Sequence, residues 1–263
     1  MNNKEQIIKS MVRCWIFEKT NFFIGIPGQE VILEPDVIIK RSNIKSDTFN
    51  CVFYVNFSKE TAEKRVRETI KIFKESDTPF TWWTCPCDTP ENLPDILVKY
   101  GLKAKEKSLG MYLDLNYIKQ EKFDNLSGLN IKRVLTKEDL FNFDQVHVIS
   151  GGDKTTYEKL FSKLSLSLYQ EGASTELYVG YCAEKPVATG MLVLYAGVAG
   201  IFYLVTVPEE RKKGYGTLMM RFLLSRAKNL GYSHAVLQAS VMGVNLYKRL
   251  GFKECCAFQE YGF

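Results

Sequence analysis

The stretch from residue 201 to residue 231 constrains the fold of this chain more than any other. Its β-branched and aromatic residues up to Val207 predict a strand, and apolar residues at helical spacing from Gly216 predict a helix that Gly231 ends. A short basic loop with two glycines joins the two elements. Free N–H groups at a helix N-terminus favour an anion, and glycine lets a ligand approach the backbone. The pattern therefore predicts a pyrophosphate-binding loop, made by Arg211, Lys212, Lys213, Gly214, Tyr215, Gly216 and Thr217.

Two other nucleotide-binding patterns fit this loop less well. A Walker loop needs a Lys followed by Ser or Thr after its second glycine, and this arrangement does not occur here. A dinucleotide fingerprint needs three glycines and an acidic residue on the next strand, but the following strand, His234 to Ala239, contains no acid. A plain strand-to-helix turn with a solvated basic surface is the remaining alternative.

A second motif follows at a suitable distance. The strand 236–239 leads through Ser240 into a short segment that carries Tyr247 and ends in Leu-Gly-Phe at 250–252. Together, Arg211-x-x-Gly214-x-Gly216 and this segment resemble the acetyl-CoA signature of the GNAT superfamily of N-acetyltransferases. The resemblance covers residues 129–263.

The resemblance implies a mechanism. The strand around Leu204 to Val207 would splay from its neighbour and leave backbone groups to pair with the pantetheine arm and to polarise the thioester carbonyl. Tyr247 would protonate the departing CoA thiolate as general acid. The alternative for Tyr247 is a tyrosine packed in the core. The implied acetyl-CoA contacts are Val205, Thr206, Val207, Arg211, Lys212, Lys213, Gly214, Tyr215, Gly216, Thr217 and Ser240.

One position departs from the common family pattern. Many members carry Asn seven residues before the tyrosine, whereas this chain has Ser240, which we interpret as a substitute polar contact. No base is assigned by the pattern, because Glu209, His147, Glu176 and Glu260 are each explained better by a structural role.

Composition narrows the class of protein. The chain has 263 residues, which suits two domains, and 35 basic against 30 acidic residues give a net charge of +5. This excess is too small to indicate a nucleic-acid-binding face, and no apolar run is long enough to span a membrane. Seven cysteines without a paired Cys-x-x-Cys pattern and only two histidines indicate neither a disulfide framework nor a metal site, so we expect a cytoplasmic protein.

The first half echoes the second. A strand at 51–57 precedes a helix at 59–73, and a strand at 80–84, a helix at 92–100 and a strand at 109–115 follow. Gly101 aligns with Gly251, and Leu97 then aligns with Tyr247. The second half should open with a strand at 129–134, a helix capped by Thr136 and a second helix at 155–169. We predict a mixed α/β fold of two tandem GNAT-like three-layer α/β/α domains, residues 1–122 and 129–263, joined by a linker at 119–128.

The alignment also predicts which half is active. The first half has leucine in place of the tyrosine, and its first helix opens at Ser58 without a glycine, so we interpret it as a degenerate, non-catalytic domain. The preferred hypothesis is an enzyme that transfers acetyl from acetyl-CoA to a primary amine of a small molecule or peptide. The alternative is an acyl-CoA-binding sensor without transfer activity. Either a monomer or a homodimer is compatible with the sequence.

Overall fold

The computed structural model describes residues 3–21, 28–118, 128–152 and 172–263. Its helices are α1 (Asn3–Asn21), α2 (Ala62–Glu75), α3 (Leu93–Lys99), α4 (Lys137–Ile149), α6 (Tyr215–Asn229) and α7 (Val244–Arg249). Its strands are β1 (Glu30–Glu34), β2 (Val37–Arg41), β3 (Cys51–Phe53), β4 (Thr81–Thr84), β5 (Lys103–Asp114), β6 (Asn130–Arg133), β7 (Thr175–Cys182), β8 (Lys185–Tyr195), β9 (Val198–Thr206), β10 (His234–Ala239) and β11 (Lys253–Gly262). The predicted helix at 155–169 and nearly all of the predicted linker lie outside the described residues.

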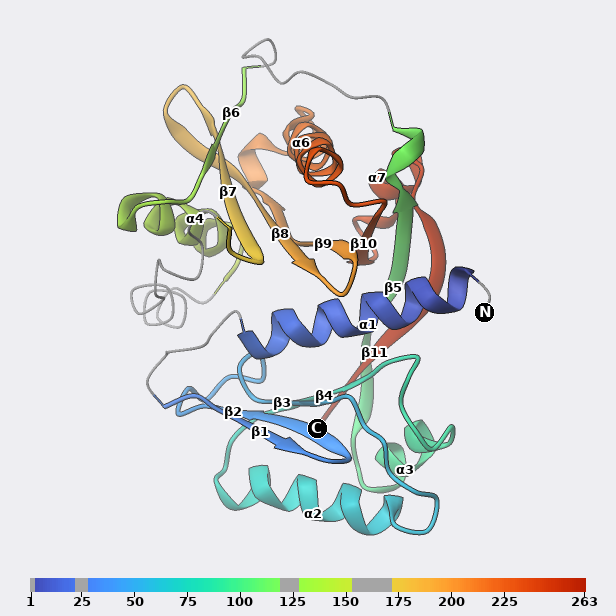
Figure 1. Ribbon diagram of the computed structural model, residues 1–263. Coiled ribbons are helices and arrows are strands. Elements are labelled where there is room, and N and C mark those ends of the chain that lie inside the picture. The colour runs from blue at the N-terminus through green and yellow to red at the C-terminus, as the bar shows by residue number, and fades with distance from the viewer. Residues whose placement is uncertain (1–2, 22–27, 119–127, 153–171) are drawn as a thin grey trace.

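The described strands form one continuous mixed sheet in the order β1-β2-β3-β4-β11-β5-β10-β9-β8-β7-β6. The last strand of each half is exchanged. Strand β5, from the first half, pairs antiparallel with β10 of the second, and β11, from the end of the chain, pairs antiparallel with β4. The two exchanged strands also pair with each other, and Figure 1 shows both running through the two halves.

Helices cover both faces of this sheet, which confirms the predicted mixed α/β fold (Figure 1). On the outer face, α2 and α3 pack on β2–β4, and α6 packs on β8–β10, so that each half has its own core. A third core lies on the opposite face, where α1 contacts strands from both halves and α4 packs on β7–β9. The amino-terminal helix α1, the hairpin β1–β2 and the strand exchange were not predicted.

Local sequence signals explain the ends of the predicted elements. Thr136 and Asp139 form the reciprocal capping box that begins α4. Gly101 and Gly251 follow α3 and α7 with φ of 93° and 94°. In each case the next residue donates its N–H back into the helix, from Leu102 to Leu97 O (3.1 Å) and from Phe252 to Tyr247 O (3.0 Å). The same local geometry therefore ends both helices. Within the described residues, no helix is both long and apolar enough to cross a membrane.

The exchanged strands and α1 meet at Gly110. This residue pairs with Gln238 of β10 and Cys256 of β11, and a Cβ atom built there would collide with the Cys256 sulfur and lie 2.9 Å from Met11 Sδ of α1. The central strand therefore has no room for a side chain under the helix.

We expect Gly110→Ala to lower the free energy of unfolding by about 1–3 kcal/mol, because the added methyl overpacks this junction. Urea unfolding measures the effect, with Lys107→Ala on the exposed part of β5 as the control that stays close to wild type. A variant as stable as wild type would contradict the close packing of α1 on β5.

Candidate active site

The parallel strands β9 and β10 pair over a short distance and then diverge. Their pairing is limited to Ala199 with Ala235 and Gly200 with Val236. Strand β9 continues to Thr206 beside β8, where Ala188 is its partner. The divergence therefore opens a slot beside residues 204–206, as the sequence analysis predicted for this strand.

A bulge shapes β9 at the start of this slot. Its register with β8 shifts between Thr189, which opposes Val205, and Met191, which opposes Phe202. Within the bulge Tyr203 has φ of 49°, a left-handed conformation that is unfavourable for a bulky residue. The hydroxyl of Thr189 donates to the Tyr203 carbonyl over 2.9 Å and holds the bulge from β8.

The glycine-containing loop lies at the end of the slot. Lys212 and Gly214 both have left-handed φ, 65° and 92°, and Gly214 is the N-cap of α6. No side chain caps this helix, and the first N–H to bond within it is that of Leu218, which donates to Gly214 O. The N–H groups of the first turn are therefore directed at the loop and suit an anion.

One cleft of about 730 Å³ joins the slot, the loop and the segment that carries Tyr247. Ten of the predicted site residues line it: Val205, Thr206, Arg211, Lys212, Gly214, Tyr215, Gly216, Thr217, Ser240 and Tyr247. Two others lie elsewhere. Val207 is buried and donates its N–H to Val187 O, and Lys213 forms an ion pair with Glu210 (2.8 Å).

The cleft also includes residues outside the predicted site, among them His147, which the sequence raised only as a possible base. The end of α4 contributes His147, Ser150, Gly151 and Gly152, and the segment around α7 contributes Met242, Gly243, Leu246 and Arg249, besides Leu204 and Glu210. The sequence signal for the first group was the Gly-Gly pair after the predicted helix. Without the fold, nothing in the sequence placed this helix end beside the phosphate-binding loop.

Tyr247 is held against the loop that precedes its helix. A Cβ atom on Gly243 would lie 2.6 Å from the Tyr247 ring, so only glycine permits this packing, and Phe252 meets the ring edge-on with the ring centroids 5.9 Å apart. Burial raises the pKa of the Tyr247 phenol to about 12. The hydroxyl is therefore protonated at neutral pH, as a proton donor must be.

His147 contacts the bulge rather than acting as an isolated surface group. Its Nε2 lies 3.1 Å from the Thr189 hydroxyl that holds the Tyr203 carbonyl. Burial lowers the pKa of His147 to about 4, so the ring is neutral at pH 7.

The acidic residues that the sequence raised as bases lie away from the cleft lining. Glu176 is buried, and burial pushes its pKa upward, but hydrogen bonds from Arg226 and Tyr178 and the charge of Arg133 bring the pKa below its usual value. Glu209 is exposed. The charge of Glu176 is paired with Arg133 and Arg226, so Glu176 serves as part of a structural ion pair.

The matching slot in the first half is closed. Strands β3 and β4 also pair in parallel over two positions and then diverge. Here Asp88 bridges the gap, because it accepts hydrogen bonds from the N–H groups of Val55 (2.9 Å) and Cys85 (2.8 Å), which follow the two strands. Thr89 N–H also donates to Val55 O. The backbone that β9 leaves open is satisfied internally in this half.

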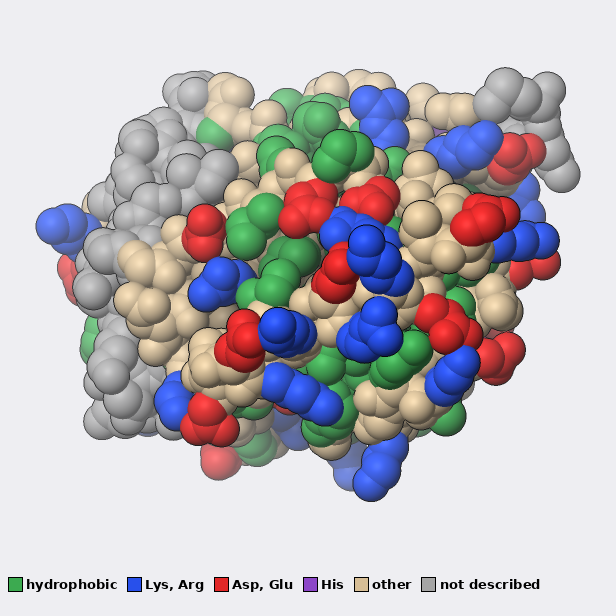
Figure 2. All heavy atoms as spheres, turned by 90° about the horizontal axis from the view of Figure 1, so that it is seen from below, with side chains coloured by type: hydrophobic (Ala, Val, Ile, Leu, Met, Phe, Trp, Pro, Cys, Tyr) green, Lys and Arg blue, Asp and Glu red, His purple; other side chains and the backbone are tan. Residues whose placement is uncertain are grey.

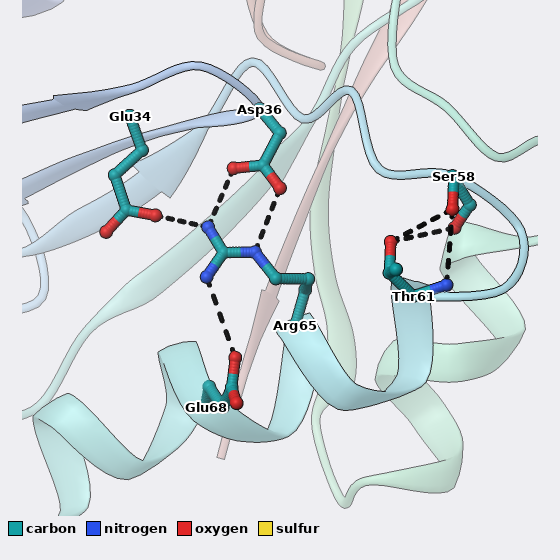
Figure 3. Close-up of polar contacts among 6 residues, drawn as sticks. All are labelled: Glu34, Asp36, Ser58, Thr61, Arg65 and Glu68. Atoms are coloured by element: carbon teal, nitrogen blue, oxygen red, sulfur yellow. Dashed lines mark hydrogen bonds and ion pairs between the residues drawn. The ribbon is translucent and has the colours of Figure 1, made fainter.

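At the start of α2, where a phosphate-binding loop would lie, backbone N–H groups are also bonded within the protein. Ser58 accepts hydrogen bonds from the N–H groups of Thr61 and Ala62, and its hydroxyl lies 3.1 Å from that of Thr61 (Figure 3). Arg65 of this helix is bound by carboxylates of Asp36, Glu34 and Glu68. Basic and acidic side chains alternate over the molecular face seen from below in Figure 2, where α2 lies.

The comparisons with known proteins agree with this geometry. The family model described as the acetyltransferase (GNAT) family matches residues 147–252. This part of the chain is a GNAT-family domain. It contains the loop, the slot and Tyr247, and membership implies acyl transfer from acyl-CoA. A search of curated proteins finds no match to the chain.

Solved structures resemble the whole chain. A GCN5-related N-acetyltransferase from Kribbella flavida has 16% identity and a TM-score of 0.68, with 95% of this chain and 94% of that chain covered. One from Sphaerobacter thermophilus has 12% identity and a TM-score of 0.65, with 98% and 91% covered. A tandem GNAT protein from the clavulanic acid biosynthesis pathway has 9% identity and a TM-score of 0.62, with 100% and 95% covered. At these identities the likeness shows the fold alone.

The closure by Asp88 predicts a pH-dependent stability. Burial raises the pKa of Asp88 from 3.8 to about 6. The folded protein therefore binds this proton more tightly than the unfolded chain, and the resulting stabilisation is present below pH 4 and is lost as the pH rises through 6. We expect the stability of wild type to fall by about 2 kcal/mol relative to Asp88→Asn between pH 4 and pH 7.

Urea unfolding of both proteins at pH 4, 5, 6 and 7 measures this difference. Other titrating groups contribute equally to the two proteins and cancel. Parallel pH profiles would contradict the role of Asp88 as the bridge between the two strands.

Proposed function

We propose that this GNAT domain is an N-acetyltransferase that transfers the acetyl group of acetyl-CoA to a primary amine. The observation that carries the proposal is the convergence of three independent features on one cleft. These are the open slot beside β9, the uncapped N-terminus of α6 and the protonated Tyr247. They suit, in that order, a pantetheine arm, a pyrophosphate and a departing thiolate.

In the proposed reaction the neutral amine nitrogen attacks the thioester carbon. A C–N bond forms, the C–S bond breaks, and Tyr247 donates its proton to the departing sulfur. The amine releases its own proton to water, and backbone N–H groups of the bulged strand around Leu204 and Val205 stabilise the oxyanion. The phosphates would bind to the backbone from Arg211 to Thr217, and Ser240 would contact the arm of the cofactor.

We also propose that the first half, residues 1–122, has no catalytic cleft of its own and that residues 129–263 carry the activity. Asp88 and Ser58 use the backbone groups that a second CoA molecule would need. Leu97, which aligns with Tyr247, is fully buried in the core beneath α3. One acyl-CoA per chain follows from this arrangement.

Titration calorimetry tests the location of the cofactor. We expect acetyl-CoA to bind to one site per chain and the double variant Gly214→Val, Gly216→Val to bind at least about tenfold more weakly, a loss of about 1.4 kcal/mol. Valine cannot adopt the left-handed φ of Gly214 without strain, and at Gly216 its Cβ would crowd Thr206 Oγ1 at 3.3 Å.

The matched control is Gly197→Val. Gly197 also has a left-handed φ, 77°, but it lies in the turn between β8 and β9, so its substitution should strain the fold and leave binding intact. Undiminished binding by the double variant would refute the proposed phosphate site.

The role of Tyr247 is tested by Tyr247→Phe. We expect kcat to fall about 10²- to 10⁴-fold, because the thiolate loses its proton donor, while the Kd of acetyl-CoA stays within about twofold. Tyr215→Phe is the control, because Tyr215 also lines the cleft but its hydroxyl is bonded to the Cys182 sulfur (3.1 Å).

Thiol release with a panel of amines measures both variants. A Tyr247→Phe enzyme that turns over at the wild-type rate would show that another group is the acid. Tight acetyl-CoA binding by the wild type without thiol release on any amine would replace the enzyme with a sensor.

A further inference from the structure

The amino-terminal helix α1 belongs to the first half in sequence, but it lies across the sheet between the two halves (Figure 1). One face of the helix, at spacings of three and four residues, contacts the strands that lead to the active site. Cys14 lies against β8 with its sulfur 3.7 Å from Val193 O. Phe17 stacks on Tyr195, at the turn between β8 and β9, at 4.3 Å.

Glu18, on the same face of α1, contacts the bulge itself. The Tyr203 hydroxyl donates a hydrogen bond to Glu18 Oε1 over 3.2 Å. Glu18 is 2% exposed, and its other carboxylate oxygen lies 3.8 Å from Lys19 Nζ. A carboxylate buried to this extent is costly unless it is paired and hydrogen-bonded, so its position opposite the bulge is a specific arrangement.

Tyr203 is therefore held at both ends. Its backbone carbonyl accepts from Thr189 of β8, and its side chain is bound by Glu18 of α1. The residue needs such restraints, because its φ of 49° is unfavourable for an aromatic side chain. The next two residues, Leu204 and Val205, line the cleft.

We propose that Glu18 is a positioning residue for acyl transfer, which fixes the β9 bulge so that the backbone of Leu204 and Val205 meets the thioester carbonyl. The inference rests on the proposed function of the cleft. It gives the first half a part in the reaction although its own slot is closed. Glu18 contacts neither cofactor nor acceptor and acts through Tyr203.

The test compares binding of acetyl-CoA with binding of S-ethyl-CoA, in which a methylene replaces the thioester carbonyl. The ratio of the two affinities measures how strongly the protein binds the thioester carbonyl, and the measurement needs no acceptor amine. We expect the wild type to prefer acetyl-CoA, and Glu18→Ala and Tyr203→Phe to lose about fivefold of this preference, the loss typical of one hydrogen bond, while affinity for S-ethyl-CoA stays within about twofold. Glu18→Gln keeps an acceptor oxygen and should retain most of the preference.

Phe17→Leu is the matched control. This substitution removes the stacking of Phe17 on Tyr195 and so weakens the packing of α1 next to Glu18, but it keeps the Glu18 contact. It should lower thermal stability while keeping the preference for acetyl-CoA. Tyr203→Phe removes a single oxygen atom and keeps the test available if Glu18→Ala fails to fold.

Three results would overturn the inference. The preference could persist in both Glu18→Ala and Tyr203→Phe, it could fall equally in Phe17→Leu, or the wild type could bind both ligands equally. Failure of the proposed function gives a different result, because the wild type would then bind neither ligand.

Discussion

The antiparallel pairing of β5 with β11 is the interaction on which the rest of the structure depends. Each strand ends its own half and lies in the sheet next to the other half, beside β10 and β4 respectively. The two halves therefore share one sheet and cannot separate without breaking its centre. This shared sheet also creates the surface on which α1 packs, and through α1 it brings Glu18 to the bulge of β9.

The same supersecondary pattern occurs twice with opposite outcomes. In the second half two parallel strands diverge, the slot stays open, and a glycine at the N-cap leaves helix N–H groups for an anion. In the first half Asp88 bridges the diverging strands, and Ser58 accepts hydrogen bonds from the N–H groups of Thr61 and Ala62 at the start of α2. The difference between a binding site and a closed core thus comes down to a few hydrogen bonds to the backbone, since buried N–H groups must be satisfied by some partner.

The parts of the account that the sequence predicted are those with local causes. Left-handed glycines at 101, 214 and 251 and the Thr136 cap mark element ends because the backbone geometry requires those residues there. The strand exchange could not be predicted, since the alternation along β5 or β11 is the same whichever strand lies beside it. Helix α1 carries Glu18 on its buried face, where it lies beside Lys19, and its tertiary contact with Tyr203 has no signal in the local sequence. Asp88 was missed for the same reason.

Hydrogen–deuterium exchange of the protein with and without acetyl-CoA tests most directly the claim that the chain has one acyl-CoA slot, in its second half. The account predicts slower exchange at the cleft-lining residues within 204–217 and 240–247, and unchanged exchange at 55–62 and 85–89. Equal protection of both regions, or protection in the first half alone, would contradict the account.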